Sequence, residues 1–313
     1  MWQILTSFCQ HQWERIYEMF DGDQSKMVFI GTFLVSSGAF FGVNLFLSIL
    51  DLTGFPQRLV KYKIQKDKNC PVSRDLFLKA LGWVIFNQTV VAFPIFFLSH
   101  IVMVWRGCSF GRQLPTLNSV FLDIAVCTLI EEILFYYSHR YATFFLLLFK
   151  FSFRFISCKN DITVLESLGL FHHRFLYKHI HKMHHEWTAP IGITAIYAHP
   201  LEHIVCNILP AIAGPIIMGS HVVTSWLWFT IALISTTVAH CGYHFPLIPS
   251  PEFHDYHHLK FVNNFGVLGI LDRLHGTDSQ FRASDAFKRH LITFSLTPVS
   301  LQFPDTCNEK KMT

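Results

Sequence analysis

Histidine is the residue type in this chain whose number and spacing point most directly to chemistry. The 313-residue sequence holds nineteen histidines, and all but His11 and His100 fall between residues 139 and 290. Three clusters have helical spacing, so the imidazoles of each are expected to share one helix face. These clusters are His181, His184 and His185, then His240 and His244, and then His254, His257 and His258. Imidazole suits iron, zinc and copper, and the clusters therefore predict a metal site.

The number of imidazoles sets the size of the predicted site. A single pair of histidines four residues apart is usually an incidental surface feature, but this chain carries two His-x2-His-His motifs together with the His-x3-His motif at His240 and His244. Buried imidazoles would cost free energy unless something occupied their lone pairs. Eight ligands exceed what one tetrahedral ion takes, so we predict two metal ions.

The elements that position these clusters are expected to lie in a membrane. The chain is 51% hydrophobic and only 15% charged, with a mean hydropathy of +0.35, so it has too little polar surface to cover itself in water. This composition excludes an extended disordered protein, a coiled coil and a disulfide-stapled domain. The net charge of +4 is small, and no nucleic-acid partner is expected. Eight scattered cysteines indicate a reducing compartment.

Apolar runs long enough to cross a hydrocarbon core of roughly 30 Å predict the spanning helices. Three runs cover residues 27–50, 80–105 and 117–137, and two later runs at 204–219 and 222–239 are typical of a helical hairpin. The predicted fold is all-α. It is a polytopic membrane bundle with about four to five membrane segments, and a histidine-rich helical cap holds the two metals.

Basic residues give the predicted orientation. The loop of residues 51–76 carries six Lys and Arg residues, whereas the loop between the second and third predicted spans has only Arg106 and Arg112. The basic loop is therefore expected in the cytoplasm, and counting crossings from there places the histidine clusters and the C-terminus on the same side. Lys310 and Lys311 resemble a dilysine retrieval signal, which predicts the endoplasmic reticulum membrane as the location.

With their neighbours, the clusters resemble the histidine boxes of the fatty acid hydroxylase and sterol desaturase superfamily of membrane di-iron oxygenases. Residues 186–190, 197–200 and 251–254 are similar to its C4-methylsterol oxidase branch. The resemblance implies two irons, with zinc as an alternative in a purified form, and O2. It also implies electrons from NAD(P)H through cytochrome b5 or its reductase. It divides the chain into an N-terminal membrane region at 1–116, a fatty acid hydroxylase-like domain at 117–300 and a tail at 301–313.

The resemblance also extends the set of expected site residues. The predicted metal ligands are His139, His173, His181, His184, His185, His240, His244, His254, His257 and His258. Groups beside the ligands are expected to fix the imidazole tautomers. The candidates for this role are His172, His199, His203, Glu202 and Asp255, with Glu131, Glu132, Glu252 and Asp272 as further carboxylates.

The first histidine box is interrupted. Members of the family have the sequence His-Arg-x-x-His-His after the third span. In this chain, residues 141–169 separate His139 and Arg140 from the pair His172 and His173. We interpret this segment as an insertion that forms a cytoplasmic or interfacial loop, since its uncharged run is too short to span a membrane. Closure entropy grows slowly with loop length, so His139 can still join the site.

The leading prediction is a di-iron monooxygenase that oxidises a methyl or other C–H group of a membrane lipid, with a C4-methylsterol favoured by the resemblance. A fatty acid or sphingolipid hydroxylase is one alternative. A catalytically impaired isoform with a regulatory or binding role is another, because the first box is split. A zinc transporter is disfavoured, since the clusters lie beyond the predicted spans. The exact lipid, the electron donor and the oligomeric state stay open.

Overall fold

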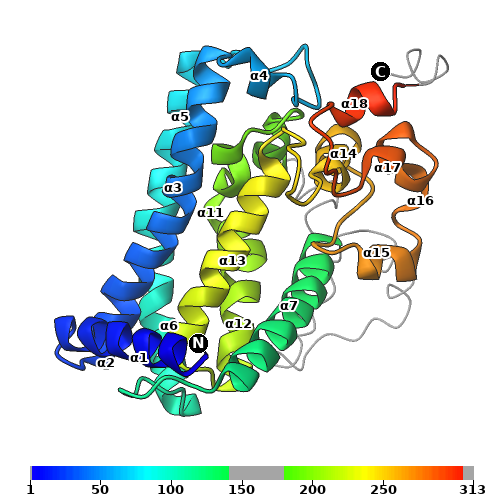
Figure 1. The fold of residues 1–313 in the computed structure, drawn as a ribbon. Coiled ribbons are helices and arrows are strands. Elements are labelled where there is room, and N and C mark those ends of the chain that lie inside the picture. Colours follow the sequence, from blue (N-terminus) through cyan, green and yellow to red (C-terminus); the bar gives the residue numbers. More distant parts are fainter. Residues whose placement is uncertain (1, 141–179, 306–313) are drawn as a thin grey trace, which may run out of the picture.

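The computed structural model describes residues 2–140 and 180–305, and within these ranges all regular structure is helical (Figure 1). The predicted all-α class is therefore confirmed. The predictions for His172, His173, the 141–169 insertion and the lysines at 310 and 311 lie outside the described residues.

Within the described ranges, four helical stretches are long and apolar enough to cross a membrane. In lipid the backbone must satisfy its own hydrogen bonds, which is why these uncharged runs form helices. The first three stretches each join α-helical pieces through a π-helical turn. They consist of α2 (Gln24–Lys26), η1 (Met27–Gly31) and α3 (Thr32–Thr53); of α5 (Arg74–Phe86), η2 (Asn87–Val91) and α6 (Ala92–Arg106); and of α11 (Pro200–Glu202), η5 (His203–Ile208) and α12 (Leu209–Met218). The fourth is α13 (Val222–His240).

The two late apolar runs form the predicted hairpin. A short turn at Gly219 joins α12 to α13, and the φ of 66° at this residue is a left-handed conformation that suits glycine. α13 packs along α3, while α12 packs along α7 (Leu117–Arg140). Gly214 permits the close approach of α12 and α7, because a Cβ there would lie 2.7 Å from Sγ of Cys127. The hairpin therefore connects the N-terminal spans to α7.

The third predicted span forms a helix, and its acidic residues distinguish it from the other long helices. α7 is not among the four helices apolar enough to span a membrane, and Asp123, Glu131 and Glu132 lie along it. Glu132 is buried, and its carboxylate accepts three backbone N–H groups between residues 267 and 271 at 2.7–3.0 Å. The carboxylate of Glu132 thus fixes the loop at residues 267–271 to α7. This contact explains why an acidic residue lies within the apolar run.

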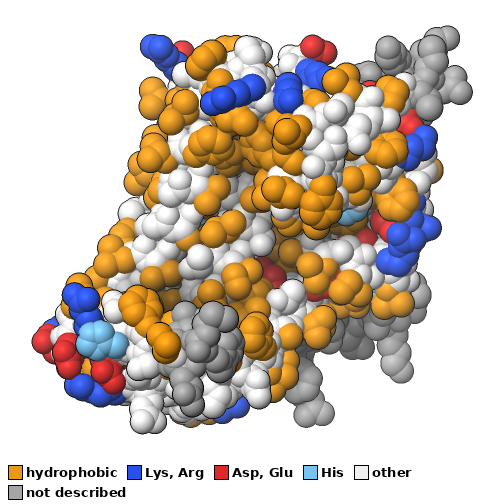
Figure 2. All heavy atoms as spheres, viewed as in Figure 1, with side chains coloured by type: hydrophobic (Ala, Val, Ile, Leu, Met, Phe, Trp, Pro, Cys, Tyr) orange, Lys and Arg blue, Asp and Glu red, His pale blue; other side chains and the backbone are white. Residues whose placement is uncertain are grey.

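Short helices gather at one end of the bundle and form the cap (Figure 1). They are α4 (Gln57–Val60), the 3-10 helices η3 (His181–Glu186) and η4 (Gly192–Ile196), α14 (Glu252–Lys260), α15 (Ile270–His275), α16 (Ser279–Arg282), α17 (Asp285–Arg289) and α18 (Val299–Gln302). The basic loop packs on this cap. The N–H of Ile64 donates to the carbonyl of Gly242, and the N–H of His244 donates to the carbonyl of Tyr62, both at 2.9 Å. The basic loop and the histidine clusters thus lie at the same end, along which Figure 2 shows Lys and Arg side chains.

The opposite end of the bundle is covered by α1 (Trp2–Met19) (Figure 1). Nε1 of Trp13 donates to the carbonyl of Gly111 at 3.0 Å, which ties α1 to the connection between α6 and α7. Trp13, Met103 and Val222 belong to one hydrophobic core, so packing crosses the predicted boundary at residue 116. The division into regions at 1–116, 117–300 and 301–313 stays a prediction.

Candidate metal centre

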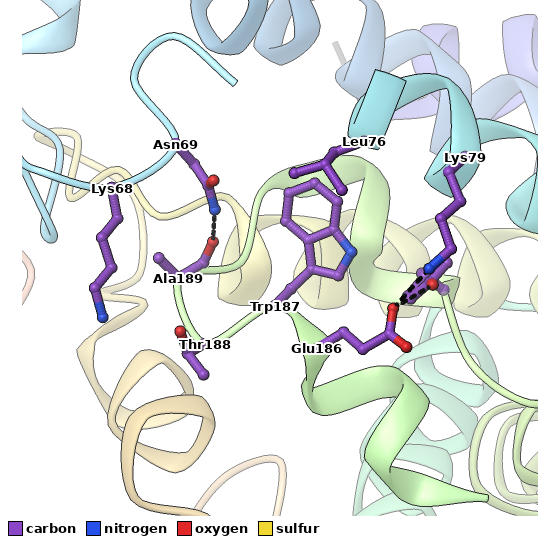
Figure 3. Close-up of a pocket in the computed structure, with 9 residues that line it drawn as sticks. Lys68, Asn69, Leu76, Lys79, Glu186, Trp187, Thr188 and Ala189 are labelled. Atoms are coloured by element: carbon purple, nitrogen blue, oxygen red, sulfur yellow. Dashed lines mark hydrogen bonds and ion pairs between the residues drawn. The ribbon is translucent and has the colours of Figure 1, made fainter. Parts of the chain in front are cut away.

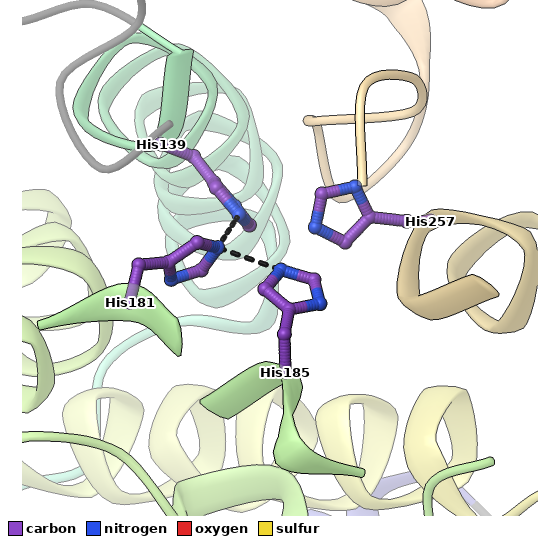
Figure 4. A group of neighbouring side chains, drawn as sticks. All are labelled: His139, His181, His185 and His257. Carbon is purple, nitrogen blue, oxygen red and sulfur yellow. Dashed lines mark hydrogen bonds between the residues drawn. The ribbon is translucent and has the colours of Figure 1, made fainter. Parts of the chain in front are cut away.

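Eight histidines of the cap come together in two groups of four. The first histidine group consists of His139, His181, His185 and His257, and Figure 4 shows these rings arranged around a common centre. The second histidine group consists of His184, His240, His254 and His258. Within each group, one nitrogen from each ring lies within 4.8 Å of the others. Each group therefore offers four nitrogen ligands to a single ion.

Four elements supply the rings, and two of them serve both groups. α7 carries His139 near its end, and α13 ends with His240. η3 and α14 each divide three histidines between the groups. In α14, His254 and His258 are four residues apart and share a face, whereas His257 points to the first group. The sequence predicted that the rings of each cluster share one helix face. In the structure, the clusters on η3 and α14 each contribute rings to both histidine groups.

Hydrogen bonds on the outer nitrogens fix the tautomers in the second histidine group. Nδ1 of His184, His240 and His258 faces a backbone carbonyl at 3.1, 2.8 and 3.0 Å, respectively. Because a carbonyl only accepts, each Nδ1 carries the proton and each Nε2 keeps a lone pair. Nε2 of His184 and Nε2 of His240 are 3.3 Å apart, so two lone pairs face each other without a proton between them. A cation would remove this repulsion, and the donor set therefore fits a metal ion.

The first histidine group is built in the same way. Nδ1 of His181 donates to Oε1 of Glu202 at 2.6 Å, and Nδ1 of His257 donates to a backbone carbonyl at 2.7 Å. Nε2 of His181 lies 3.1 Å from Nε2 of His139 and 2.7 Å from Nε2 of His185. Buried neutral imidazoles with their inner nitrogens this close suit iron, zinc or copper.

Acid is expected to destabilise the metal-free cap. Burial lowers the pKa of His257 to about 3 and holds the pKa of His185, His254 and His258 well below the ordinary value of 6.5. Below pH 6.5 the unfolded chain binds protons that the folded chain does not, so this stability is complete above pH 6.5 and declines as the pH falls. The thermal midpoint of chelator-treated protein should therefore drop between about pH 6.5 and about pH 5. A level midpoint over this range would contradict the burial of neutral rings.

Glu202 is expected to control metal affinity in the first histidine group. Its buried carboxylate holds the ring of His181 in place, and removing such a partner typically weakens metal binding 10- to 100-fold. We expect Glu202→Gln to weaken binding at the first group by about 10- to 100-fold and to leave the second group unchanged. Competition with a chromophoric chelator measures both affinities. The control is Glu18→Gln, which alters an exposed carboxylate at the other end of the bundle, and equal affinities in the two variants would refute this role.

His244 lies outside both histidine groups, although its spacing from His240 predicted a ligand. The physical reason is that α13 ends at His240, so the next residues do not continue the helix. Gly242 has a φ of 70°, and the chain turns there. Nε2 of His244 then donates to the carbonyl of Leu291 at 2.9 Å. We therefore leave His244 out of the proposed ligands.

Other residues predicted beside the ligands have different contacts. The side-chain Nδ2 of Asn207 donates to Nδ1 of His203 at 3.1 Å, and both residues lie in the candidate membrane-spanning stretch. His199 precedes α11 and accepts the N–H of Leu201 at its start. Asp255 accepts a hydrogen bond from the side chain of Gln65 at 3.1 Å. Of the predicted supporting groups within residues 2–140 and 180–305, Glu202 is the one with a hydrogen bond to a ring of the first histidine group.

Several groups that orient the rings are backbone carbonyls, which the sequence could not reveal. His184 donates to the carbonyl of Tyr197, and His258 donates to the carbonyl of Trp187. The carbonyl that orients His257 belongs to residue 263, in a loop whose following N–H groups are held by two buried carboxylates. These carboxylates, Glu132 and Asp272, were predicted to contact imidazoles. They act on the backbone of residues 265–271 instead.

A helical bundle with four candidate spans, capped by two groups of buried imidazoles, defines a class of membrane protein with a candidate two-metal histidine centre. The family model for fatty acid hydroxylase matches residues 168–277, which include seven of the eight grouped histidines. This chain belongs to the fatty acid hydroxylase family.

Similar proteins extend the match beyond that segment. The chain is 44% identical over 305 residues to fatty acid hydroxylase domain-containing protein 2 of Macaca fascicularis, covering 97% of this chain and 83% of that protein. It is 30% identical over 298 residues to methylsterol monooxygenase 2-2 of Arabidopsis thaliana, covering 91% and 98%. It is 29% identical over 295 residues to very-long-chain aldehyde decarbonylase GL1-8 of Oryza sativa subsp. indica, covering 88% and 93%. No solved structure gives a significant match.

Proposed function

We propose that the protein is a membrane monooxygenase that uses two iron ions and O2 to oxidise a C–H group of a lipid. The observation that carries this proposal is the pair of histidine groups, whose anchored rings bring their inner nitrogens together. Two irons bound there would supply the activation of O2 that an unactivated C–H group requires. The proposed ligands are the eight histidines of the two groups, with His173 as a further ligand outside the described residues.

The chain's own contribution is to orient the ligands and to exclude water. The outer hydrogen bonds of His181, His184, His240, His257 and His258 fix which nitrogen of each ring is free to bind a metal. All eight rings are buried, so bulk water is kept from the nitrogens. This arrangement prepares the ligand set before any metal arrives and lowers the cost of binding.

A C4-methylsterol is the substrate that we propose first, in a pathway of sterol biosynthesis. The full-length similarity to a methylsterol monooxygenase supports this substrate, whereas aldehyde decarbonylases and a fatty acid hydroxylase are also similar. The chain is 32% identical over 251 residues to fatty acid hydroxylase ahd1 of Mycosarcoma maydis, which supports a fatty acid or sphingolipid as the alternative. Electrons would come from NAD(P)H through cytochrome b5 or its reductase.

Lipid analysis of membranes tests this function. Cells that express the full chain are supplied with a 4-methylsterol, a very-long-chain fatty acid or a ceramide, and lipid extracts are compared with those of cells without the protein. We expect oxidised 4-methylsterol to accumulate in an O2-dependent manner. Oxidised fatty acid or ceramide alone would move the proposal to the alternative substrate. Unchanged profiles for all three lipids would contradict the proposed activity.

The impaired-isoform alternative rests on the interruption after Arg140. The position of His139 in the first histidine group supports an active chain, because the interruption does not separate this ring from its partners. Deleting residues 141–169 distinguishes the two proposals. An active chain should show little gain in lipid oxidation after the deletion, whereas an impaired isoform should show a large one.

We also propose that the protein resides in the endoplasmic reticulum membrane with its cap in the cytoplasm. The packing of the basic loop on the cap supports this orientation, since cytoplasmic loops are rich in Lys and Arg.

A further inference from the structure

A small pocket lies on the cap beside the second histidine group, between the basic loop, the start of α5 and the chain that follows η3 (Figure 3). We call it the Trp187 pocket. Its volume is about 250 Å³, and its lining includes Lys68, Leu76, Lys79, Glu186, Trp187 and Tyr197. This volume is below the roughly 300–1,000 Å³ of sites that hold drug-sized ligands, so the pocket is too small for a whole lipid. It suits a side chain of a docked partner better.

Two residues that line the Trp187 pocket are hydrogen-bonded to rings of the second histidine group. The carbonyl of Trp187 accepts the Nδ1 proton of His258 at 3.0 Å, and the carbonyl of Tyr197 accepts that of His184 at 3.1 Å. The side chain of Trp187 is itself only 7% exposed, and it lines the pocket. One hydrogen bond therefore separates the wall of a surface pocket from two of the four proposed ligands of a metal.

Exposed cations flank this opening. Lys68 and Lys79 are exposed on either side of Trp187, and Lys79 pairs with Glu186 at 3.0 Å (Figure 3). The basic loop and the first turn of α5 carry four more exposed cations, which are Arg58, Lys61, Lys66 and Arg74. These cations outnumber the nearby exposed acidic residues, which are Asp67, Asp75 and Glu186. We call the exposed cations of the basic loop and of the start of α5 the basic rim. Their charge is complementary to that of an acidic protein surface.

The basic rim is fixed to the pocket wall. Nε2 of Gln65 donates to the carbonyl of Thr188 at 2.9 Å, and Nδ2 of Asn69 donates to the carbonyl of Ala189 at 2.7 Å. Both bonds join the basic loop to the residues that follow Trp187. A partner that binds the loop is thereby held at a set position relative to the indole, as a short electron path requires.

We infer that the Trp187 pocket and its basic rim form the docking surface for an acidic one-electron carrier protein, with Trp187 and its hydrogen bond to His258 as the electron path. This inference rests on the proposed function. Each turnover would convert O2, a C–H group, two electrons and two protons into an alcohol and water. The docked carrier supplies the electrons one at a time and is oxidised at each delivery.

Charge reversal at the rim tests the docking surface in full-length, iron-loaded protein. The variant is Lys68→Glu with Lys79→Glu, and the matched control is Lys26→Glu with Arg112→Glu at the opposite end of the bundle. The readout is the rate of lipid oxidation with the reduced haem domain of cytochrome b5, divided by the rate with dithionite. At low ionic strength we expect this ratio to fall about tenfold or more in the rim variant only, with the difference shrinking as salt is added. Equal ratios in the rim variant and the control would overturn the inference.

A binding measurement separates failure of docking from failure of the proposed activity. Titration calorimetry with the same haem domain should give a Kd at least about tenfold higher for the rim variant than for the control. If the parent protein made no product even with dithionite, the proposed function would fail, while this titration would still test the surface. Equal Kd values for rim variant and control would then overturn the docking surface on its own.

A substitution of the indole tests the electron path separately from docking. Trp187→Phe keeps an aromatic ring and the backbone carbonyl that orients His258. We expect stopped-flow oxidation of the haem domain to slow severalfold with little change in its Kd. An unchanged oxidation rate would remove Trp187 from the path.

Discussion

Replacing His257 or His184 by alanine is expected to remove one metal ion from each chain and to abolish lipid oxidation. His257 belongs to the first histidine group and His184 to the second, so each substitution should empty one site and spare the other. The parent should hold about two metals per chain and either variant about one. Elemental analysis of purified protein gives the metal content, and sterol analysis of lipid extracts gives the activity.

The matched control for this experiment is His11→Ala, since His11 is exposed on α1 at the opposite end of the bundle. Membrane extraction and gel filtration should show that all three variants insert and fold. Lipid oxidation that persists in His257→Ala or His184→Ala would remove that histidine from the metal centre. Loss of both metals in one variant would mean that the two groups do not bind independently.

Replacing Lys63 by methionine is expected to destabilise the protein by about 3–5 kcal/mol. Nζ of Lys63 lies 3.2 Å from Oδ1 of Asp51 at the end of α3, and both side chains are 2% exposed. The ammonium also lies 4.4 Å from the ring centre of Tyr243. Without Lys63, a carboxylate would stay buried without its counter-charge, and this is costly where water is excluded. The apparent unfolding midpoint in detergent measures the loss.

The double variant Asp51→Asn with Lys63→Met shows whether the buried charge is the cause. Removing both charges of a buried pair is often nearly neutral, so the midpoint should recover most of the way to that of the parent. A double variant as unstable as Lys63→Met would indicate that lost packing, and not the uncompensated charge of Asp51, accounts for the effect.

The membrane architecture could be predicted because it depends on local composition. The apolar runs at 27–50, 80–105, 204–219 and 222–239 each form a helix that could span a membrane, and the turn at Gly219 makes the hairpin. α7 follows less directly from composition, because its acidic residues keep it out of the set of helices that are apolar enough to span a membrane. Its carboxylate at Glu132 is held by backbone N–H groups more than 130 residues further along the chain, and no local pattern reveals that contact.

The histidine clusters were visible in the sequence, but their division between two groups was not. Helical spacing cannot tell which ring of η3 or α14 belongs to which group, because this depends on where the fold places these helices relative to His139 and His240. His244 shows the same limit, since the end of α13 at His240 breaks the assumed helical spacing. The carbonyls of Trp187 and Tyr197 carry no side-chain signal, so a sequence cannot show that they orient rings.

Anomalous X-ray scattering at the iron edge, from crystals of the full-length protein, tests most directly whether the cap holds two metals. We expect two separate peaks, one bounded by His139, His181, His185 and His257 and the other by His184, His240, His254 and His258. A single peak, or none in a map that resolves these rings, would contradict a two-metal centre.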